Sequence, residues 1–332
     1  MQSAIAITGG SGFVGSALAK HLSEDFYVRI LDKVHMQHVA PNGVEFVECD
    51  IRRYDEVQQA IEDTDLVIHT AIIQIPEISE KKRSAYEVNV IGTQNICEAV
   101  RCNHDSKGLI LAGSWHVIGE RQTAALIDEK FGSRPDFVED RARFYVLSKI
   151  AQESIVRLYD EEANGRVYGI LRIGTVLGDG MPQKTAANTF IDRAMRGEPL
   201  TPYQHSMYRP MLYVDVLDVC RAFKSYALKI LHGKVGKVRN SLDHIVNVWY
   251  PEPITVLELA EIVRESVFRL SDGVIVPEIK ITKTGEVGPF TSEDKQRMKV
   301  DMTKARDLLG LEMLAAPKAA IDRIVMARLS RT

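Results

Sequence analysis

A glycine-rich turn near the start of the chain constrains the fold more than any other stretch: Thr8-Gly9-Gly10-Ser11-Gly12-Phe13-Val14-Gly15. The apolar residues 4–7 precede this turn and predict a buried strand, and residues 16–22 follow it with the pattern of an amphipathic helix. Strand, glycine turn and helix in this order are typical of the phosphate-binding opening of a dinucleotide fold.

The glycines Gly9, Gly12 and Gly15 are expected to serve three purposes. One allows a tight turn, one lets backbone N–H groups approach a pyrophosphate, and one lets the helix pack closely on the strand. The backbone from Gly12 through Phe13 and Val14 to Gly15 is therefore expected to bind the cofactor. Gly10, Gly12 and Gly15 also fit a second variant of the motif, so spacing alone leaves the variant open. A plain flexible loop is the alternative, and the position between strand and helix disfavours it.

Further strands alternate with helices along the first half of the chain. The apolar pattern predicts strands at 26–31, 44–49, 65–70, 108–112 and 167–172, and helices at 54–61, 79–102 and 140–162. This alternation predicts an α/β fold, a Rossmann-type doubly wound parallel sheet with helices on both faces. Ligands of such sheets bind at the carboxyl ends of the strands, and the pattern places Asp32, Asp50 and Ser114 there.

Asp32 ends the second predicted strand. A carboxylate at that strand end accepts hydrogen bonds from the ribose hydroxyls of the adenosine half of the cofactor. The same charge repels a 2′-phosphate, so Asp32 favours NAD over NADP. The single neighbouring base, Lys33, does not change this prediction. A solvated loop carboxylate is the alternative interpretation.

The composition narrows the classes of partner. A chain of 332 residues suits two domains, or one large domain with a lobe. The net charge of −3 offers no basic surface for nucleic acid, and no apolar run reaches the roughly 18 residues that span a bilayer. The four cysteines are scattered, with no C-x-x-C pair, which argues against disulfides and against a metal site and predicts a cytoplasmic protein. Because a strand is predicted at the very start of the given sequence, no signal peptide is expected.

The regular alternation ends after residue 173. We therefore predict an NAD-binding domain at residues 1–173 with a return segment at about 210–231. Residues 174–209 and 232–332 are expected to form a smaller mixed lobe that binds the substrate. The cleft between sheet and lobe is the expected substrate site.

Tyr145 and Lys149 are four residues apart on a predicted helix, so their side chains share a face. Ionising a phenol with a pKa of about 10 at neutral pH costs roughly 4 kcal/mol. An ammonium about 4 Å away offers a similar energy at an effective dielectric constant of about 20, before desolvation. Lys149 is therefore expected to bring Tyr145 into the range of general acid–base catalysis, with Ser114 hydrogen-bonded to the same substrate oxygen. On its own, Tyr-x-x-x-Lys most often marks only a helix face.

Several further motifs follow one another along the chain: Cys49-Asp50-Ile51, His69-Thr70-Ala71, Asn89 to Asn95, Ser114 with Gly119, Leu171-Arg172 with Gly178, Arg209 to Val216 and Asp301 to Gly310. Together with the glycine turn, Asp32 and Tyr145-x-x-x-Lys149, they span most of the chain. With these motifs in this order, the chain resembles the extended short-chain dehydrogenase/reductase family of nucleotide-sugar epimerases and dehydratases.

The resemblance implies roles at the reacting carbon. Tyr145 would exchange a proton with a sugar hydroxyl, and Ser114 would orient the reacting oxygen. Lys149 would bind the nicotinamide ribose and depress the pKa of the tyrosine. Family members commonly form homodimers through two helices, which correspond here to about 79–103 and 140–162.

The resemblance also implies contacts with NAD. Asp50 and Ile51 would meet the adenine, Ala71 would line the cofactor channel, and Tyr145 and Lys149 would meet the nicotinamide end. Asn89 is predicted with equal weight as a cofactor-site residue or as a structural residue that supports a water or a carbonyl near Lys149.

The substrate side departs from the family pattern. Trp115 and His116 follow Ser114 where dehydratases carry an acid pair, which disfavours dehydration. His116 is expected in the substrate site, as a packing or hydrogen-bonding residue rather than as an acid–base group. Thr175 stands where 4-epimerases carry an asparagine that contacts the nucleotide diphosphate.

Arg209 and Arg297 are the candidate ligands of a diphosphate, with ion pairing or surface exposure as the alternative. The leading hypothesis is an NAD-dependent nucleotide-sugar 4-epimerase. The second is a dehydrogenase of a sugar, uronate or hydroxy acid that releases NADH, because residues 114–119 and 172–174 are partly similar to uronate dehydrogenases. A dinucleotide-sensing regulator is the third, and the presence of Ser114, Tyr145 and Lys149 disfavours it.

Overall fold

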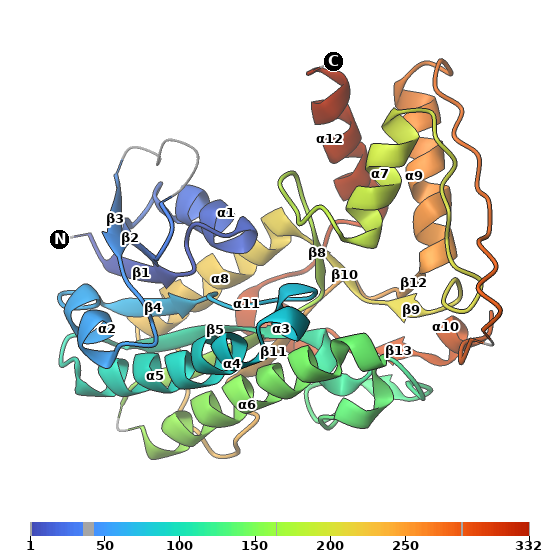
Figure 1. The fold of residues 1–332 in the computed structure, drawn as a ribbon. Helices are drawn as coiled ribbons and strands as arrows, with labels where there is room; N and C mark the ends of the chain where they lie inside the picture. The colour runs from blue at the N-terminus through green and yellow to red at the C-terminus, as the bar shows by residue number, and fades with distance from the viewer. Residues whose placement is uncertain (1, 36–42, 164, 287, 332) are drawn as a thin grey trace.

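A seven-stranded parallel sheet organises the chain (Figure 1). The computed structural model describes residues 2–35, 43–163, 165–286 and 288–331. Neighbouring strands are parallel throughout the sheet. The spatial order is β11 (Ile245–Val248), β7 (Val167–Ile173), β5 (Gly108–Ser114), β4 (Leu66–His69), β1 (Ala4–Thr8), β2 (Tyr27–Asp32) and β3 (Val44–Glu48). The strand order reverses between β1 and β4, which is where such sheets bind ligands.

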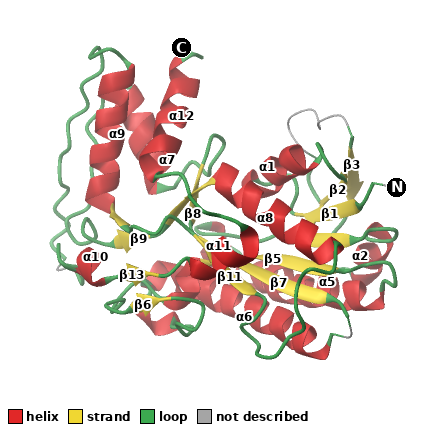
Figure 2. Cartoon of the chain, turned by 180° about the vertical axis from the view of Figure 1, so that it is seen from behind, coloured by secondary structure: helices red, strands yellow, loops and turns green. Residues whose placement is uncertain are grey.

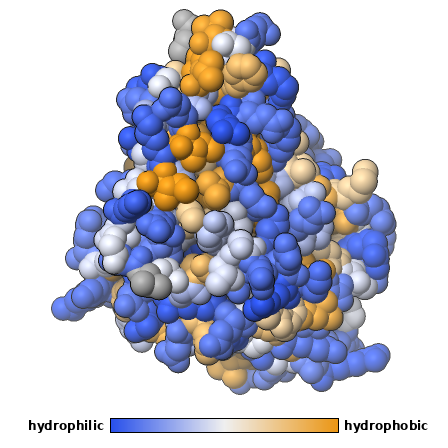
Figure 3. All heavy atoms as spheres, turned by 90° about the vertical axis from the view of Figure 1, so that its right-hand side faces the viewer, coloured by the Kyte–Doolittle hydropathy of each residue, from blue (hydrophilic) through white to orange (hydrophobic). Residues whose placement is uncertain are grey.

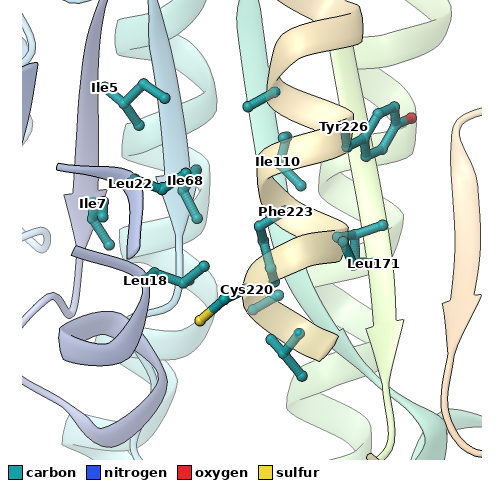
Figure 4. Packing of buried hydrophobic residues seen from close by; sticks show 14 of the residues in the cluster. Ile5, Ile7, Leu18, Leu22, Ile68, Ile110, Leu171, Cys220, Phe223 and Tyr226 are labelled. Carbon is teal, nitrogen blue, oxygen red and sulfur yellow. The ribbon is translucent and has the colours of Figure 1, made fainter. Parts of the chain in front are cut away.

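Helices cover both faces of the sheet, which confirms the predicted doubly wound fold (Figure 2). On one face lie α1 (Phe13–Leu22) and α8 (Val216–Leu231), and on the other α2 (Tyr54–Ala60), α5 (Gly92–Cys102) and α6 (Asp140–Glu162). Figure 4 shows how α1 and α8 pack on the strands: Leu18, Leu22 and Phe223 meet Ile68 and Ile110, all buried. Among the helices described, none is long and apolar enough to cross a bilayer.

Two parts of this domain differ from the prediction. The single helix expected at 79–102 is divided into α3 (Glu77–Glu80), α4 (Lys82–Tyr86), a π-helical turn at Glu87–Ile91 and α5. The edge strand β11 was not expected, because residues 232–332 were assigned to the lobe. Its four residues, Ile-Val-Asn-Val, include a buried polar residue and are too few to show a strand pattern.

The lobe combines short strand pairs with three helices (Figure 1). The pairs are β8 (Thr175–Leu177) with β10 (Tyr213–Asp215), β9 (Pro210–Met211) with β12 (Ile254–Thr255), and β6 (Leu126–Ile127) with β13 (Lys299–Val300). The helices are α7 (Ala186–Met195), α9 (Val256–Leu270) and α12 (Pro317–Leu329), with a capping box from Thr255 to Glu258 at the start of α9. A separate apolar cluster forms the lobe core, and apolar side chains also reach the lobe surface among polar ones (Figure 3).

Short elements complete the chain. Helix α11 (Thr303–Leu309) packs on α8 and β11, and Ala305 and Leu309 join the core of the sheet domain. Helix α10 (Asp294–Arg297) and the 3-10 turns at Trp115–Ile118 and Pro135–Phe137 lie in the connecting segments. The late part of the chain therefore contributes to both the sheet domain and the lobe.

Candidate active site

The glycine turn joins β1 to α1 in a crowded position. Gly9 has a φ of +68°, and a Cβ there would lie 2.6 Å from the backbone of Ala71. A Cβ on Gly15 would lie 2.3 Å from the carbonyl oxygen of Gly9. Both contacts are shorter than any Cβ tolerates, so the turn needs glycine at both positions. A Cβ on Gly10 would also lie 2.5 Å from the side chain of Ile30, so the crowding fits both variants of the motif.

The start of α1 fits a pyrophosphate. The first N–H groups of a helix have no partner within it, and within the described chain no side chain caps α1 at Gly12. The first turn of α1 also carries no acidic residue. Exposed amides and the positive end of the helix dipole favour an anion here. The predicted contacts at Phe13 and Val14 belong to this first turn.

Asp32 lies against the glycine turn. Its Oδ2 accepts the backbone N–H of Ser11 (3.1 Å) and its Oδ1 accepts that of Val34 (3.2 Å). The Ser11 hydroxyl donates to the carbonyl of Val34 (2.6 Å), which ties the end of β2 to the turn. The half-buried carboxylate therefore sits beside the pyrophosphate cradle, where a ribose diol of NAD would bind.

Asp50 has partners that the sequence analysis did not foresee. Arg52 donates to both carboxylate oxygens (2.9 Å from Nε to Oδ1 and 2.5 Å from Nη2 to Oδ2), and Lys33 Nζ lies 3.1 Å from Oδ2. The hydrogen bonds from Arg52 hold the pKa of Asp50 far below its usual range. The next residue, Ile51, is buried, and a Cβ on Gly92 would lie 2.6 Å from its side chain. Contact of Asp50 and Ile51 with adenine stays a prediction.

Asn89 is fully buried in the π-helical turn. Its Oδ1 accepts the N–H of Ile73 (2.8 Å), and its Nδ2 donates to the carbonyl of Ile73 (3.1 Å) and to Ser148 Oγ (3.1 Å). Both protons of the amide are therefore used within the protein. These contacts fit the structural alternative, in which Asn89 holds the segment after β4 against α6, and its place in the cofactor site stays a prediction.

Ser114, Tyr145 and Lys149 come together at the end of β5 and on α6. Burial raises the pKa of Tyr145, and a hydrogen bond with Ser114 opposes the rise. Lys149 Nζ donates to the carbonyl oxygen of Ala112 (2.8 Å), and burial lowers the pKa of Lys149 to about 7. The expected depression of the tyrosine pKa by the lysine does not appear among the causes of its shift. The physical reason is that both groups are desolvated and the ammonium is directed at a backbone carbonyl.

A buried network of polar side chains around His69 lies next to Lys149. His69 Nδ1 accepts the hydroxyl of Thr8 (2.7 Å), and its Nε2 lies 2.9 Å from Thr93 Oγ1, which Gln152 also approaches (2.9 Å). Burial and the nearby Lys149 charge lower the pKa of His69 to about 3, so its ring is neutral. The network connects β1, β4, α5 and α6 under the site.

His116 contacts Ser114 and the ring of Tyr145. The Nδ1 atom of His116 is 3.2 Å from Ser114 Oγ, and its Nε2 is 3.4 Å from the Oε1 of the buried Glu120. The His116 ring meets the Tyr145 ring edge to face, with centroids 6.0 Å apart. Burial lowers the pKa of His116 to about 4, so the ring is neutral and its Nε2–H points to Glu120. This agrees with the expectation of a hydrogen-bonding histidine.

The predicted diphosphate ligands are partly engaged within the protein. Arg209 is buried, with Nη1 2.5 Å from Glu139 Oε1 and 3.9 Å from Glu120 Oε1, whereas its buried Nε has no hydrogen-bond partner in the described chain. Burial alone would raise the pKa of Glu139, but Arg209 and Arg141 hold it below its usual value. Thr175 Oγ1 accepts the indole N–H of Trp115 (3.0 Å).

A cavity of about 480 Å³ opens beside the charged group formed by Arg209, Glu120 and Glu139. Arg297 borders it and pairs with Glu293 (2.7 Å). The walls also include Glu120, Arg121, Phe137, Pro210 and Phe290. Glu120 therefore connects the cavity to His116 and, through it, to Ser114. In the parts of the chain that the structure describes, no group of three or more His, Cys, Asp or Glu residues is arranged to hold a metal ion.

Sequence reasoning missed Glu120 and Glu139. Glu120 is four residues from His116, a spacing that could have suggested a pair, but its burial follows from the fold of the 115–139 segment. The contact of Glu139 with Arg209 joins residues 70 positions apart and left no local signal.

Comparison with known proteins identifies the family to which the chain belongs. The model of the NAD dependent epimerase/dehydratase family matches residues 5–240. The chain belongs to this family. It is 30% identical over 274 residues to a Methanocaldococcus jannaschii protein named provisionally as a UDP-glucose 4-epimerase, covering 79% of this chain and 82% of the relative. It is also 30% identical over 210 residues to D-erythronate dehydrogenase of Haemophilus influenzae, covering 59% and 62%.

Solved structures of similar shape show the same fold over the whole chain. UDP-glucose 4-epimerase of Thermotoga maritima with UDP-glucose has a TM-score of 0.77 at 21% identity, covering 99% of this chain and 100% of that one. UDP-glucose 4-epimerase of Thermus thermophilus in complex with NAD has a TM-score of 0.75 at 24% identity, covering 98% and 99%. The protein is thus an NAD-dependent enzyme of the extended short-chain dehydrogenase/reductase type.

Proposed function

We propose that the enzyme epimerises a nucleotide sugar by transient oxidation to a ketone and re-reduction. One observation carries this proposal: the Ser114–Tyr145 pair is linked through His116 and Glu120 to the wall of a cavity of about 480 Å³. Small-molecule sites of roughly 300–1,000 Å³ bury most of a ligand of this size class. The cavity therefore offers room for the nucleotide beyond the reacting sugar.

The chain's residues account for the proton transfers. Ser114 holds the reacting oxygen, and Tyr145, as the phenolate, takes the proton of the sugar hydroxyl as the C–H bond breaks. NAD, when bound, would supply the hydride acceptor and a positive charge that favours ionisation of the Tyr145 phenol. The ketone then presents its other face, the hydride returns to the same carbon, and Tyr145 returns the proton to the oxygen. Hydride and proton both leave and return, so there is no net oxidation.

His116 disfavours dehydration. Dehydratases need an acid–base pair next to the residue at the position of Ser114. Here Trp115 donates its indole N–H to Thr175, and His116 is neutral and held between Ser114 and Glu120. These side chains are committed to contacts within the protein.

A dehydrogenase of a sugar, uronate or small hydroxy acid is the second candidate. The pairing of Arg209 with Glu139 favours it, because the arginine expected to bind a diphosphate already has a carboxylate partner. The similarity to D-erythronate dehydrogenase of H. influenzae also supports it.

Turnover with NAD separates the two candidates. The purified enzyme is incubated with UDP-glucose or UDP-galactose, and the sugar products are resolved by chromatography while NADH is followed by absorbance. An epimerase produces the other sugar and no free NADH. Accumulation of NADH in step with substrate loss would establish the dehydrogenase instead. Tyr145→Phe is the matched control and is expected to abolish either reaction.

We also propose that the protein is a cytoplasmic homodimer. Leu147 and Leu158 of α6 are about half exposed although apolar, and so are Tyr86 and Ile91 on the neighbouring segment. These residues lie on the two helical segments expected to pair in this family. Light scattering of the purified protein measures the mass directly, and Leu158→Glu is expected to shift the protein toward the monomer.

A further inference from the structure

Two cations lie beside the carboxylate that is expected to bind the adenosine ribose. Lys33 follows Asp32 directly, and Arg52 follows β3 on the neighbouring strand. Asp50 contacts both cations, with Nζ of Lys33 3.1 Å and Nη2 of Arg52 2.5 Å from its Oδ2. Arg52 Nη1 also lies 3.4 Å from Glu87. We call these four residues, Lys33, Asp50, Arg52 and Glu87, the Asp50 cluster.

The cluster lies at the cofactor edge of the sheet. The N–H of Cys49 donates to the carbonyl of Asp32 (3.1 Å), which places Asp50 next to the end of β2. Asp32 itself contacts Ser11 of the glycine turn (3.1 Å). Lys33 directly follows Asp32 at the end of β2, and Arg52 lies four residues after the end of β3. Both cations are therefore close in sequence to the strand ends where the ribose is expected to bind.

Free cations at this edge would change the choice of cofactor. Dinucleotide folds that bind NADP place an arginine or lysine near this strand end to pair with the 2′-phosphate. Here Arg52 forms a bidentate contact with Asp50, and the same carboxylate holds Lys33, so both charges already have a partner.

We propose that Asp50 is a second determinant of NAD specificity, which acts by holding Lys33 and Arg52 away from the 2′-position. Asp32 repels a 2′-phosphate directly, and Asp50 withholds the two cations that would otherwise attract it. The inference depends on the use of NAD but not on the proposed reaction, since epimerase and dehydrogenase bind the same cofactor.

The test measures cofactor affinity without any substrate. Dissociation constants of NAD and NADP are determined by isothermal titration calorimetry for the wild type and for Asp50→Asn. In Asp50→Asn the ratio of the NADP dissociation constant to the NAD dissociation constant is expected to fall about tenfold. The reason is that the released Lys33 and Arg52, at a partly solvated site, attract the 2′-phosphate that only NADP carries. Any contact between Asp50 and adenine affects both cofactors alike and cancels in this ratio.

Two further variants make the result specific. Asp55→Asn removes an equal charge from an exposed position on α2 that is paired with neither cation, and it should leave the ratio unchanged. Adding Lys33→Gln and Arg52→Gln to Asp50→Asn should restore the wild-type ratio.

An unchanged ratio in Asp50→Asn, with both constants raised together, would overturn the proposal and leave Asp50 an adenine or packing residue. If Asp50→Asn fails to fold, Lys33→Gln is the deciding variant. The ratio of the two dissociation constants stays at the wild-type value if Asp50 already keeps Lys33 away from the 2′-position. A ratio that rises in Lys33→Gln means that this cation already attracts the 2′-phosphate, which also refutes the proposal.

Discussion

Lys149 gives the cofactor-free enzyme a pH dependence of stability that can be worked out from its burial. The residue is 4% exposed, and burial lowers the pKa of its amine from 10.5 to about 7. Between these two values the unfolded chain holds a proton that the folded chain has released. Because the unfolded state then binds more protons, the free energy of unfolding rises with pH across this window.

The magnitude follows from the size of the shift. A fully developed difference of one proton changes the free energy of unfolding by about 1.36 kcal/mol per pH unit. Since the folded amine is half titrated at its pKa, the gain from pH 7 to about pH 9 is about 2 kcal/mol. Lys149→Met carries no titrating group and should lack this gain.

Urea denaturation at several pH values measures the difference between wild type and variant. The stability of the wild type relative to Lys149→Met should rise by about 2 kcal/mol from pH 7 to about pH 9, whatever other groups titrate in both proteins. Lys20→Met, at an exposed position on α1, serves as the control and should show no such difference. Parallel pH curves for the wild type and Lys149→Met would refute the reasoning.

Three other substitutions test separate parts of the structure. Glu153→Gln leaves the guanidinium of Arg172 buried without its charge partner, now 2.9 Å away, and should lower the free energy of unfolding by about 3–5 kcal/mol in urea denaturation. Gly15→Ala places a Cβ 2.3 Å from the carbonyl of Gly9 and should abolish NAD binding in calorimetry, whereas Ala17→Gly on the same helix should retain it. Asn89→Ala leaves partly buried backbone groups of Ile73 unpaired and should cost about 1–3 kcal/mol, seen as a lower melting temperature. Unchanged stability in Glu153→Gln or Asn89→Ala would contradict these assignments.

The sheet could be predicted because its central strands are continuous apolar runs. Residues 5–8, 66–69 and 108–114 are buried on both faces and show this pattern without tertiary information. β11 could not be predicted, because four residues with a buried Asn247 are stabilised by pairing with β7 rather than by local preference. Asn89 in the π-helical turn at 87–91 likewise bonds to Ile73, a contact between separate segments that the local sequence does not show.

The candidate site was predictable where spacing determines geometry. Tyr145 and Lys149 share a helix face, and Ser114 ends a strand, so their meeting follows from secondary structure. The partners of charged side chains did not follow from spacing, since Glu139 reaches Arg209 and Lys33 reaches Asp50 only through the fold. For the same reason the rise in the Tyr145 pKa of the cofactor-free chain could not be foreseen, because burial depends on the packed structure.

The central claim is that one carbon loses and regains the same hydride within the site. UDP-glucose carrying deuterium at the C4 position of the sugar, incubated with the enzyme and NAD, tests it most directly by mass spectrometry and proton NMR of the products. The expected product is UDP-galactose that retains the deuterium at C4, with no labelled NADH in solution. Deuterium recovered in free NADH, with an oxidised sugar as the product, would contradict it.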